Sequence, residues 1–330
     1  MAAANTVLET AGIRELLDVY SRRALYTALG PSRWLEFASR EEDLLKTKGD
    51  TIKINRVADI DGSADLVENV AMTAAGITST QAEIVVSERG RALTVTEKLA
   101  QLSYLDFLDE GSKILGRHYQ RFGPELLVKQ TAQLGAATTF FAGGSANRAA
   151  LSASDVFDSE TVRDAVEALE TENVPKIEMD NGEEFYVCIC HPRQLRYLRQ
   201  DANWIAAHNA HRTRKIFAGE AGEFEGVVFI SDTNVLNGAA AATGRTSTAY
   251  IRESTISATN FLSSAAAGSS VDVYMATVFG ASAFAFATAL PVEMRQGGVV
   301  DYGREHGLAW YAIYGAGVLN DLHIVNIESA

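Results

Sequence analysis

The sequence is poor in the features that mark secreted and membrane-spanning proteins. It has only two cysteines, Cys188 and Cys190, which lie too close together to staple a fold, so a reducing compartment is the simpler interpretation. No apolar run reaches the ~18 residues of a membrane span. The first residues, MAAANTVLETAG, lack the basic start and apolar core of a signal peptide. The sequence therefore predicts a soluble product that is made or assembled inside a cell, without a membrane partner.

Positive charge is also scarce. The chain has 29 Lys and Arg residues against 42 Asp and Glu residues, for a formal net charge of −13. A protein that binds free nucleic acid tightly is normally basic, so sequence-specific DNA recognition is not expected. An acidic protein can still lie beside packed DNA without holding it, because like charges repel.

Catalytic and metal-binding motifs are missing. No Gly-x-Ser-x-Gly occurs, because Gly144-Ser145-Ala146 and Ala281-Ser282-Ala283 lack the flanking glycines. The six histidines form no metal-ligand pair with a catalytic Glu. Cys188-Ile-Cys190-His191 has no second pair of cysteines to complete a zinc site, so buried structural cysteines are expected. We therefore predict no catalytic, cofactor-binding or metal-binding residues and no enzyme activity.

Two glycine-rich stretches raise the question of phosphate binding. Phosphate loops run from strand to glycine loop to helix, whereas Gly219 to Gly226 follows a predicted helix at about 203–217 and precedes a strand. Its glutamates Glu220, Glu223 and Glu225 would also repel phosphate. We expect a tight structural turn that leads into a buried strand at Val227–Ile230.

The second stretch is Gly315-Ala-Gly317, which resembles half of a dinucleotide fingerprint. Asn320 occupies the third glycine position, and too few residues follow Gly317 to form a crossover helix and a second strand. We expect a hairpin connection between strands at 308–314 and 322–327.

The predicted secondary structure changes several times in the first half of the chain. Residues 1–48 are predicted to be helical and peripheral, and Thr51–Val57 alternates like a strand with one buried face. Strands are expected to return at 82–88 and 92–96 after a long excursion of small and polar residues. Residues 103–141 read as helical, with a break at Gly123-Pro124 and a second stretch from Glu125 to about Phe141.

The second half of the chain, from about residue 150, has an α/β pattern. Asp158 is a candidate cap for a helix whose apolar face includes Val162 and Leu169. Phe185–Cys190 is apolar throughout, which is typical of a central strand buried on both faces. His191-Pro192 is expected to begin the next helix. Residues 237–270 are rich in small residues and indicate loops, and strands follow over 271–290 and in the closing segment 291–330.

A basic segment stands out at 193–215. It contains Arg193, Arg196, Arg199, Arg212, Arg214 and Lys215, with Asp201 as its only acid. Three interpretations are open: a solvated helix face, a contact with an acidic neighbouring subunit, or a surface that faces DNA.

The order of these elements resembles the major capsid proteins of tailed bacteriophages with the Hong Kong 97 fold, and most closely the coliphage N-four-type branch. The stretches that carry the resemblance are Gly49-Asp-Thr-Ile-Lys-Ile-Asn-Arg56, Cys190-His-Pro-Arg-Gln-Leu195, Gly219–Ser231, Tyr274–Ala285 and Tyr302–Ile327. The resemblance covers nearly the whole chain. No single stretch is highly specific for this family, but the order of the stretches along the chain is.

The resemblance implies an α+β fold of four parts. These are an N-terminal arm (1–48), an extended β-loop (49–98), a peripheral domain with a long spine helix (99–148 and 291–330) and an axial α/β domain (149–290). It implies self-assembly into hexamers and pentamers of an icosahedral virion shell around double-stranded DNA, in the host cytoplasm. The expected partners are other copies of the chain, portal, scaffolding and decoration proteins, and packaged DNA without sequence specificity; no cofactor is implied.

Candidate subunit contacts follow from the arm, the loop and the charged segments. They are Arg56, Asp61, Glu68, Arg193, Arg196, Glu220 and Glu223. Some members of this fold join a lysine of the extended loop to an asparagine of a neighbour, but no lysine lies between Ile54 and Glu97, so we expect no such crosslink. The chain begins directly before the arm, so a separate scaffolding protein is expected.

The sequence is also compatible with two other functions. An encapsulin-like nanocompartment shares the fold but encloses protein cargo. An acidic α/β enzyme that uses the region 185–232 belongs to a different class and would be a monomer rather than a shell subunit.

Overall fold

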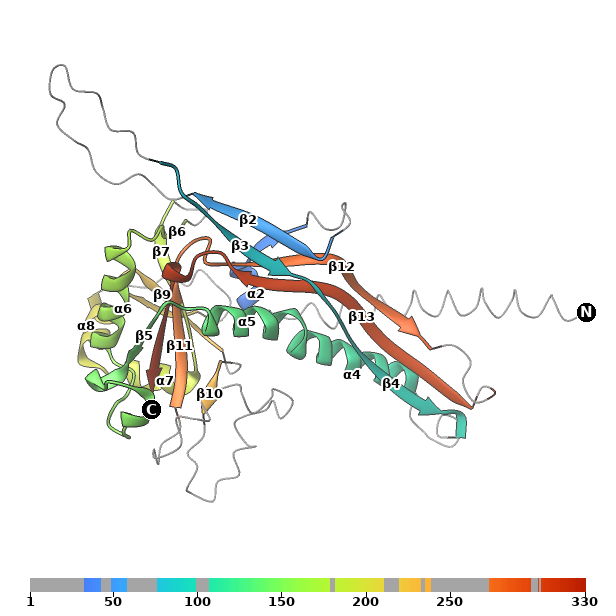
Figure 1. The fold of residues 1–330 in the computed structure, drawn as a ribbon. Coiled ribbons are helices and arrows are strands. Elements are labelled where there is room, and N and C mark those ends of the chain that lie inside the picture. The colour runs from blue at the N-terminus through green and yellow to red at the C-terminus, as the bar shows by residue number, and fades with distance from the viewer. Residues whose placement is uncertain are drawn as a thin grey trace, which may run out of the picture. The chain divides into compact units, whose positions relative to one another are not determined.

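Figure 1 shows the computed structural model of the chain. It describes residues 33–42, 49–57, 76–98, 107–178, 182–210, 220–232, 235–238, 273–297, 302 and 304–330. Most of the predicted N-terminal arm, the predicted excursion between 58 and 75, and most of the predicted loop region 237–270 therefore lie outside the described residues. The chain divides into two compact units. The first unit includes Ser39–Glu125 and Ala285–Leu319, and the second includes Leu126–Phe284 and Asn320–Ala330.

The first unit is built on a four-stranded sheet. Its strand order is β1 (Ser39–Glu41), β12 (Phe284–Gln296), β13 (Glu305–Val318) and β4 (Ser87–Thr96). A short helix, α2 (Trp34–Phe37), precedes β1 in the chain. The long antiparallel ladder between β13 and β4 runs from the pair Glu305–Thr96 to the pair Tyr314–Ser87.

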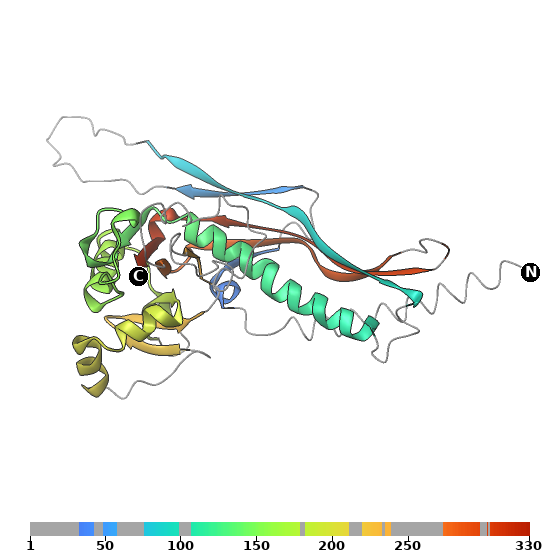
Figure 2. The same cartoon turned by 90° about the horizontal axis from the view of Figure 1, so that it is seen from below.

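Helix α4 (Phe107–Phe122) lies along β13 and β4, as Figure 2 shows. The side chains of β13 alternate: Leu308, Trp310, Ala312 and Tyr314 are buried, and the residues between them are half-buried. Alternation of this kind marks a sheet with one covered face. The Tyr119 ring of α4 stands edge-on to Trp310, with ring centroids 5.2 Å apart, so α4 covers the buried face.

A separate two-stranded ribbon consists of β2 (Thr51–Val57) and β3 (Ser79–Val85), paired antiparallel from Thr51–Val85 to Val57–Ser79. The strand predicted at Thr51–Val57 is confirmed. Ile52, Ile54 and Ile84 pack with Val86, Ala285 and Ala287 into a small apolar cluster. The inner face of the ribbon therefore contributes to the core of the first unit.

The hairpin predicted at Gly315-Ala-Gly317 is wrong. Strand β13 continues through both glycines to Val318, and the next strand, β14 (Ile324–Ser329), belongs to a different sheet. A Cβ atom on Gly315 would lie 2.3 Å from the Val85 carbonyl oxygen, and one on Gly317 would lie 2.7 Å from Ile84 Cγ1. The glycines therefore let β3 lie directly against β13, which is a close backbone approach rather than a turn.

The second unit is built on a larger mixed sheet. Its main strand order is β5 (Thr138–Phe141), β14, β11 (Val273–Phe279), β7 (Glu184–Cys190), β9 (Val227–Ser231) and β8 (Glu220–Phe224). Two short strands extend it, because β10 (Asn237–Gly238) pairs with β11 and β6 (Ile177–Glu178) pairs with β7. Strand β7 is buried from Phe185 to Cys190, as predicted for a central strand.

Helices α6 (Ser159–Thr171), α7 (Pro192–Leu198) and α8 (Ala202–Ala210) supply apolar side chains to one face of this sheet. Cys188 and Cys190 lie in that core without a disulfide, which confirms the prediction of buried structural cysteines. Burial raises the pKa of the Cys188 thiol well above its ordinary value, so it stays protonated. The predicted cap of α6 is confirmed, since the Asp158 carboxylate accepts a hydrogen bond from the Thr161 amide at 3.0 Å.

The predicted second helical stretch is too long. Helix α5 (Pro124–Leu134) ends at Leu134, and Thr138–Phe141 forms strand β5, which pairs in parallel with β14. Gly135 follows the last helical residue, and two threonines and two phenylalanines favour a strand. The predicted helix at 203–217 corresponds to α8 as far as Ala210, and residues 211–219 lie outside the described ranges.

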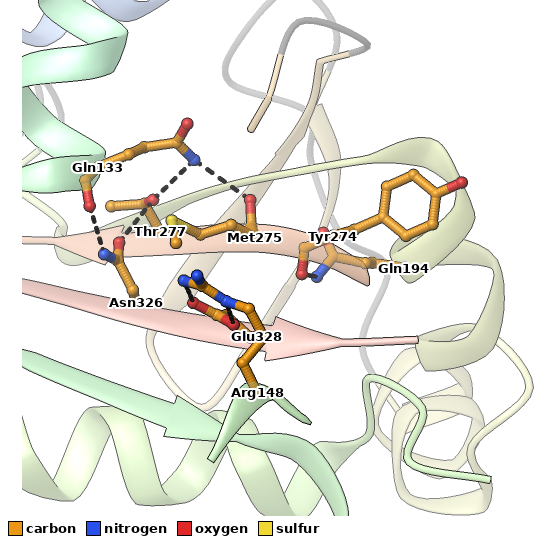
Figure 3. A network of polar contacts seen from close by, with 8 residues as sticks. All are labelled: Gln133, Arg148, Gln194, Tyr274, Met275, Thr277, Asn326 and Glu328. Atoms are coloured by element: carbon orange, nitrogen blue, oxygen red, sulfur yellow. Dashed lines mark hydrogen bonds and ion pairs between the residues drawn. The ribbon is translucent and has the colours of Figure 1, made fainter. Parts of the chain in front are cut away.

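A buried polar network covers the other face of the sheet (Figure 3). The Gln133 amide nitrogen, on α5, donates to the Met275 carbonyl at 3.2 Å and to Thr277 Oγ1 at 3.1 Å. Its amide oxygen accepts from the Leu236 backbone N–H at 3.0 Å. The Gln133 carbonyl accepts from the Asn326 amide at 2.6 Å, and Thr277 Oγ1 donates to Asn326 Oδ1 at 2.9 Å. The network thus joins α5 to β11, to β14 and to the segment before β10.

Two further buried contacts hold β14 in the sheet. Arg148 binds both carboxylate oxygens of Glu328, whose side chain is fully buried. A buried carboxylate is tolerated only with such a partner, because its desolvation is costly. The Gln194 amide of α7 donates to the Tyr274 carbonyl at 3.1 Å and to Ser329 Oγ at 2.9 Å.

We predict that Gln133→Leu destabilises the second unit by about 2–4 kcal/mol, because it leaves the Leu236 N–H and the Met275 carbonyl buried without partners. Urea unfolding of the unassembled chain measures this change. Gln130→Leu, on the same helix and partly exposed, is the matched control and should change the stability by less than about 1 kcal/mol. Equal losses of stability in the two variants would show that the hydrogen bonds of Gln133 do not stabilise the second unit.

Candidate subunit-contact surfaces

The first candidate surface is helix α7, which carries Arg193 and Arg196. His191 caps it: the His191 Nδ1 atom accepts a hydrogen bond from the Arg193 amide at 3.2 Å, and the His191 amide donates to Gln194 Oε1 at 3.1 Å. Pro192 occupies the first helical position, where its missing N–H costs nothing. The prediction that His191-Pro192 begins a helix is confirmed, and the reciprocal pair is a capping box.

The cap is packed against the sheet. The His191 ring stacks on Tyr274, with centroids 4.4 Å apart and planes 20° apart, and the Arg193 guanidinium lies 5.6 Å from the centre of the same Tyr274 ring. Burial lowers the pKa of His191, the neighbouring Arg193 lowers it further, and Asp232 opposes them. The imidazole therefore stays neutral at pH 7 and keeps an acceptor nitrogen for the cap.

The two arginines differ in their surroundings. Arg193 is half-buried against Tyr274, whereas Arg196 and Arg199 are exposed. Residues 212–215, which contribute the rest of the basic segment, lie outside the described ranges. The described part of the segment therefore presents Arg196 of α7 and Arg199, which follows the helix, as accessible positive charges.

The second candidate surface is the glycine-punctuated stretch, where a tight turn leads into the buried strand β9 as predicted, but the turn is shorter than expected. Residues Glu220–Phe224 form the edge strand β8, which pairs antiparallel with β9. The turn is confined to Glu225 and Gly226, both with positive φ (52° and 73°). Two consecutive positive φ values are typical of a tight β-hairpin. Gly222, with φ 148°, lies at a shift in register that forms a bulge.

The three glutamates of this hairpin have different surroundings. Glu225 forms an ion pair with Arg163 of α6 at 3.0 Å, within the same chain. Glu223 is exposed on the edge strand opposite Val228. Glu220 lies in register with Ile230 at the start of β8. Sequence reasoning missed Arg163, because it lies 62 positions before Glu225 in the chain and no local signal indicates their contact.

The remaining predicted contact residues lie in the first unit. Arg56 is exposed on β2 opposite Thr80, and Asp61 and Glu68 lie outside the described residues. Lys53 and Glu83 form an ion pair of 2.7 Å across the ribbon. Val57, Ile77 and Val85 are largely exposed on and beside the ribbon, at 62%, 77% and 59%. Val57 and Val85 lie at opposite ends of the ribbon, so these exposed side chains are spread along it and do not form one patch.

The described residues form neither a metal site nor a membrane-spanning helix. Within them, no group of three or more His, Cys, Asp or Glu side chains gathers where it could hold a metal ion. None of the helices in the described part of the chain is long and apolar enough to cross a membrane.

Comparison with known proteins gives a family. A family model described as phage capsid protein matches residues 132–320, more than half of the chain. No curated protein matches.

Solved structures share the fold over most of the chain. The capsid of Ralstonia phage GP4 is 18% identical, with a TM-score of 0.66 over 89% of this chain and 87% of that chain. The capsid asymmetric unit of cyanophage Pam1 is 17% identical, with a TM-score of 0.64 over 88% and 87%. The SrpI encapsulin complex from Synechococcus elongatus is 10% identical, with a TM-score of 0.55 over 91% and 87%.

These findings confirm the predicted α+β fold of the Hong Kong 97 type. They also confirm that the protein is structural and not an enzyme, which removes the alternative of an acidic α/β enzyme. The match over residues 132–320 includes Gln133, helix α7 and the β8–β9 hairpin, whereas Asn326 of the polar network lies beyond it. The chain belongs to the phage capsid protein family, and it is a shell-forming subunit of a virion capsid.

Proposed function

We propose that this chain is the major capsid protein of a tailed bacteriophage and assembles into hexamers and pentamers of an icosahedral shell around double-stranded DNA. The family match over residues 132–320 is the observation that carries the proposal. Assembly takes place in the cytoplasm of the bacterial host, with portal, scaffolding and decoration proteins as partners. The net charge of −13 is compatible with a container that does not hold its genome tightly.

Each segment has a proposed role in the shell. Residues 1–48 are the arm, 49–98 the extended loop, 99–148 and 291–330 the peripheral domain, and 149–290 the axial domain. These segments do not follow the two compact units at every boundary, because β14 pairs with β11 and so joins the second unit.

Within the family we propose the coliphage N-four-type branch. This proposal is supported by the stretches of sequence that resemble that branch and by the helices and strands that these stretches form. Gly49–Arg56 leads into and forms most of β2, Cys190–Leu195 joins the end of β7 to α7, and Gly219–Ser231 contains the β8–β9 hairpin.

Contacts between copies are proposed to involve Arg56, Asp61, Glu68, Arg193, Arg196, Glu220 and Glu223. The pairing of Glu225 with Arg163 inside the chain leaves Glu223 as the exposed hairpin glutamate that can meet a neighbour. Glu223 and Arg196 are both exposed and opposite in charge. We propose that the edge strand β8 of one copy faces α7 of the next.

An encapsulin-like nanocompartment is the second candidate function, favoured by the likeness to the SrpI encapsulin complex over 91% of this chain. Both candidates predict closed particles made of this chain. They differ in the contents of the particle.

We predict that particles isolated from cells infected with the phage contain double-stranded DNA protected from nuclease. The contents are measured by nuclease treatment, extraction and gel electrophoresis, with negative-stain images as the check that the particles are closed. A matched preparation opened by denaturation before nuclease treatment is the control. Closed particles that contain a cargo protein and no DNA would support the nanocompartment instead.

We predict that Glu223→Arg weakens assembly without changing the stability of the subunit, because it places like charges at the proposed contact. A loss of about 1 kcal/mol per contact raises the concentration needed for assembly about fivefold. Light scattering against protein concentration measures this value, and Arg196→Glu in the same chain should restore it in part. Glu167→Arg, an exposed change on α6, is the matched control. Unchanged assembly of Glu223→Arg would rule out this contact.

We also predict that mature shells carry no lysine–asparagine crosslink from the extended loop. No lysine lies between Ile54 and Glu97, Lys53 is already engaged with Glu83, and Lys98 is the last residue of the loop. Intact shells boiled in detergent should run as one band at 35.6 kDa on a gel. A ladder of covalent multimers would be the opposite result.

A further inference from the structure

His118 is in an unusual position on helix α4, since it uses a ring nitrogen as a hydrogen-bond acceptor. The Trp310 Nε1–H of β13 donates to His118 Nδ1 at 3.2 Å. The imidazole also lies 5.0 Å from the Phe122 ring and 5.9 Å from the Trp310 ring, measured between centroids. A nitrogen that accepts a hydrogen bond carries no proton, so this contact requires a neutral imidazole.

This contact is at the centre of the packing between α4 and the sheet of the first unit. Trp310 is 3% exposed, and Tyr119 stands edge-on to it from the neighbouring position of α4. Burial raises the pKa of Tyr119 to about 12, so this phenol stays neutral across the physiological range. The hydrogen bond between β13 and His118 is thus donated by the indole N–H of Trp310, and the neighbouring Tyr119 adds no charge to it.

The charged groups around His118 do not favour an imidazolium ion. Burial lowers the pKa of His118, and the Arg91 guanidinium of β4 lowers it further. On α4 itself the adjacent groups are Arg117 and the neutral Tyr119. On the sheet, Arg89 of β4 lies 5.5 Å over the Tyr314 ring of β13, and burial raises the pKa of that phenol too. Among the described residues, no carboxylate contributes to the pKa shift of His118.

We propose that His118 is an acid-sensitive latch that holds α4 on β13. When the imidazole gains a proton, Nδ1 becomes a donor that faces the Trp310 N–H, and the hydrogen bond is lost. The imidazolium also lies in the field of Arg91. Helix α4 then loosens from the sheet while the strand ladders, such as that between β13 and β4, are joined through backbone groups and stay paired.

The direction of the pH dependence follows from proton linkage. The pKa of His118 in the folded chain lies below its ordinary value of 6.5, so the unfolded chain takes up the proton first as the pH falls. The stability that depends on neutral His118 is complete above pH 6.5. It decreases as the pH falls through 6.5 and reaches its minimum below the lowered pKa of the folded state.

Another histidine provides an internal contrast. His323 Nδ1 lies 2.8 Å from the Ala281 carbonyl oxygen, which can only accept, so His323 must donate there. A donor nitrogen keeps its hydrogen bond when the ring gains a second proton. His323 is therefore a matched control for His118. His191, which also accepts through Nδ1, caps α7 in the second unit and its effect is the same in every His118 variant.

Hydrogen exchange read by mass spectrometry tests the latch in the full chain. His118→Asn replaces Nδ1 by an amide oxygen that can accept from Trp310 at any pH, and His118→Leu removes the acceptor. At each pH between 7.5 and 5 the exchange of peptides from α4 is compared with that of peptides from α6. We expect α4 of the wild type to open faster than α4 of His118→Asn at pH 5 but not at pH 7.5, with α6 unchanged.

Urea unfolding gives the second readout. The unfolding constant of the wild type relative to His118→Asn should rise between pH 7.5 and 5, by about tenfold for each unit by which the pKa of His118 lies below 6.5. His323→Gln should follow the wild type, and His118→Leu should be weaker at pH 7.5 with little further change in acid. Equal pH dependence of wild type and His118→Asn would overturn the proposal. If His118→Asn does not fold, Trp310→Phe, which removes the donor, should depend less on pH than the wild type but keep the part that burial and Arg91 cause.

Discussion

The second unit depends on one amide side chain. Gln133 is 1% exposed, and both its amide nitrogen and its amide oxygen are hydrogen-bonded inside the protein. Its backbone carbonyl binds Asn326, which is 193 residues further along the chain. Because a buried polar group without partners is costly, these bonds allow a single arrangement of α5, β11 and β14. Apolar packing alone would tolerate several positions of α5 on this face.

The two faces of the large sheet are therefore organised by different forces. The face with Cys188, Cys190 and Phe229 is apolar and is covered by α6, α7 and α8. The opposite face carries Thr277, Asn326 and Glu328, each with a polar partner. Burial gives the first face its stability, and hydrogen bonds fix the position of the elements on the second. A sheet fixed in this way can present α7 and the β8 edge at defined positions, which a repeating contact between subunits requires.

Local sequence signals predicted the local structure well. The Asp158 cap, the start of α7 at His191-Pro192 and the buried strand at Phe185–Cys190 each depend on neighbouring residues, and all three are confirmed. The errors concern distant partners. Thr138–Phe141 is a strand because β14 lies beside it, and Gly315 and Gly317 lie within a strand because β3 crosses them. The same limit applies to the candidate contacts: exposure of Arg196 and Glu223 could be anticipated, but the Arg163–Glu225 pair could not.

The ribbon of β2 and β3 adds an energetic reason for assembly that does not depend on family likeness. An isolated two-stranded hairpin is at best marginally stable in water. The inner side chains Ile52, Ile54 and Ile84 gain some burial against the first unit, and Gly315 allows that approach. Val57, Ile77 and Val85 remain largely exposed. Covering these side chains with another copy would lower the free energy of the chain, and this is the energetic reason for assembly that the ribbon supplies.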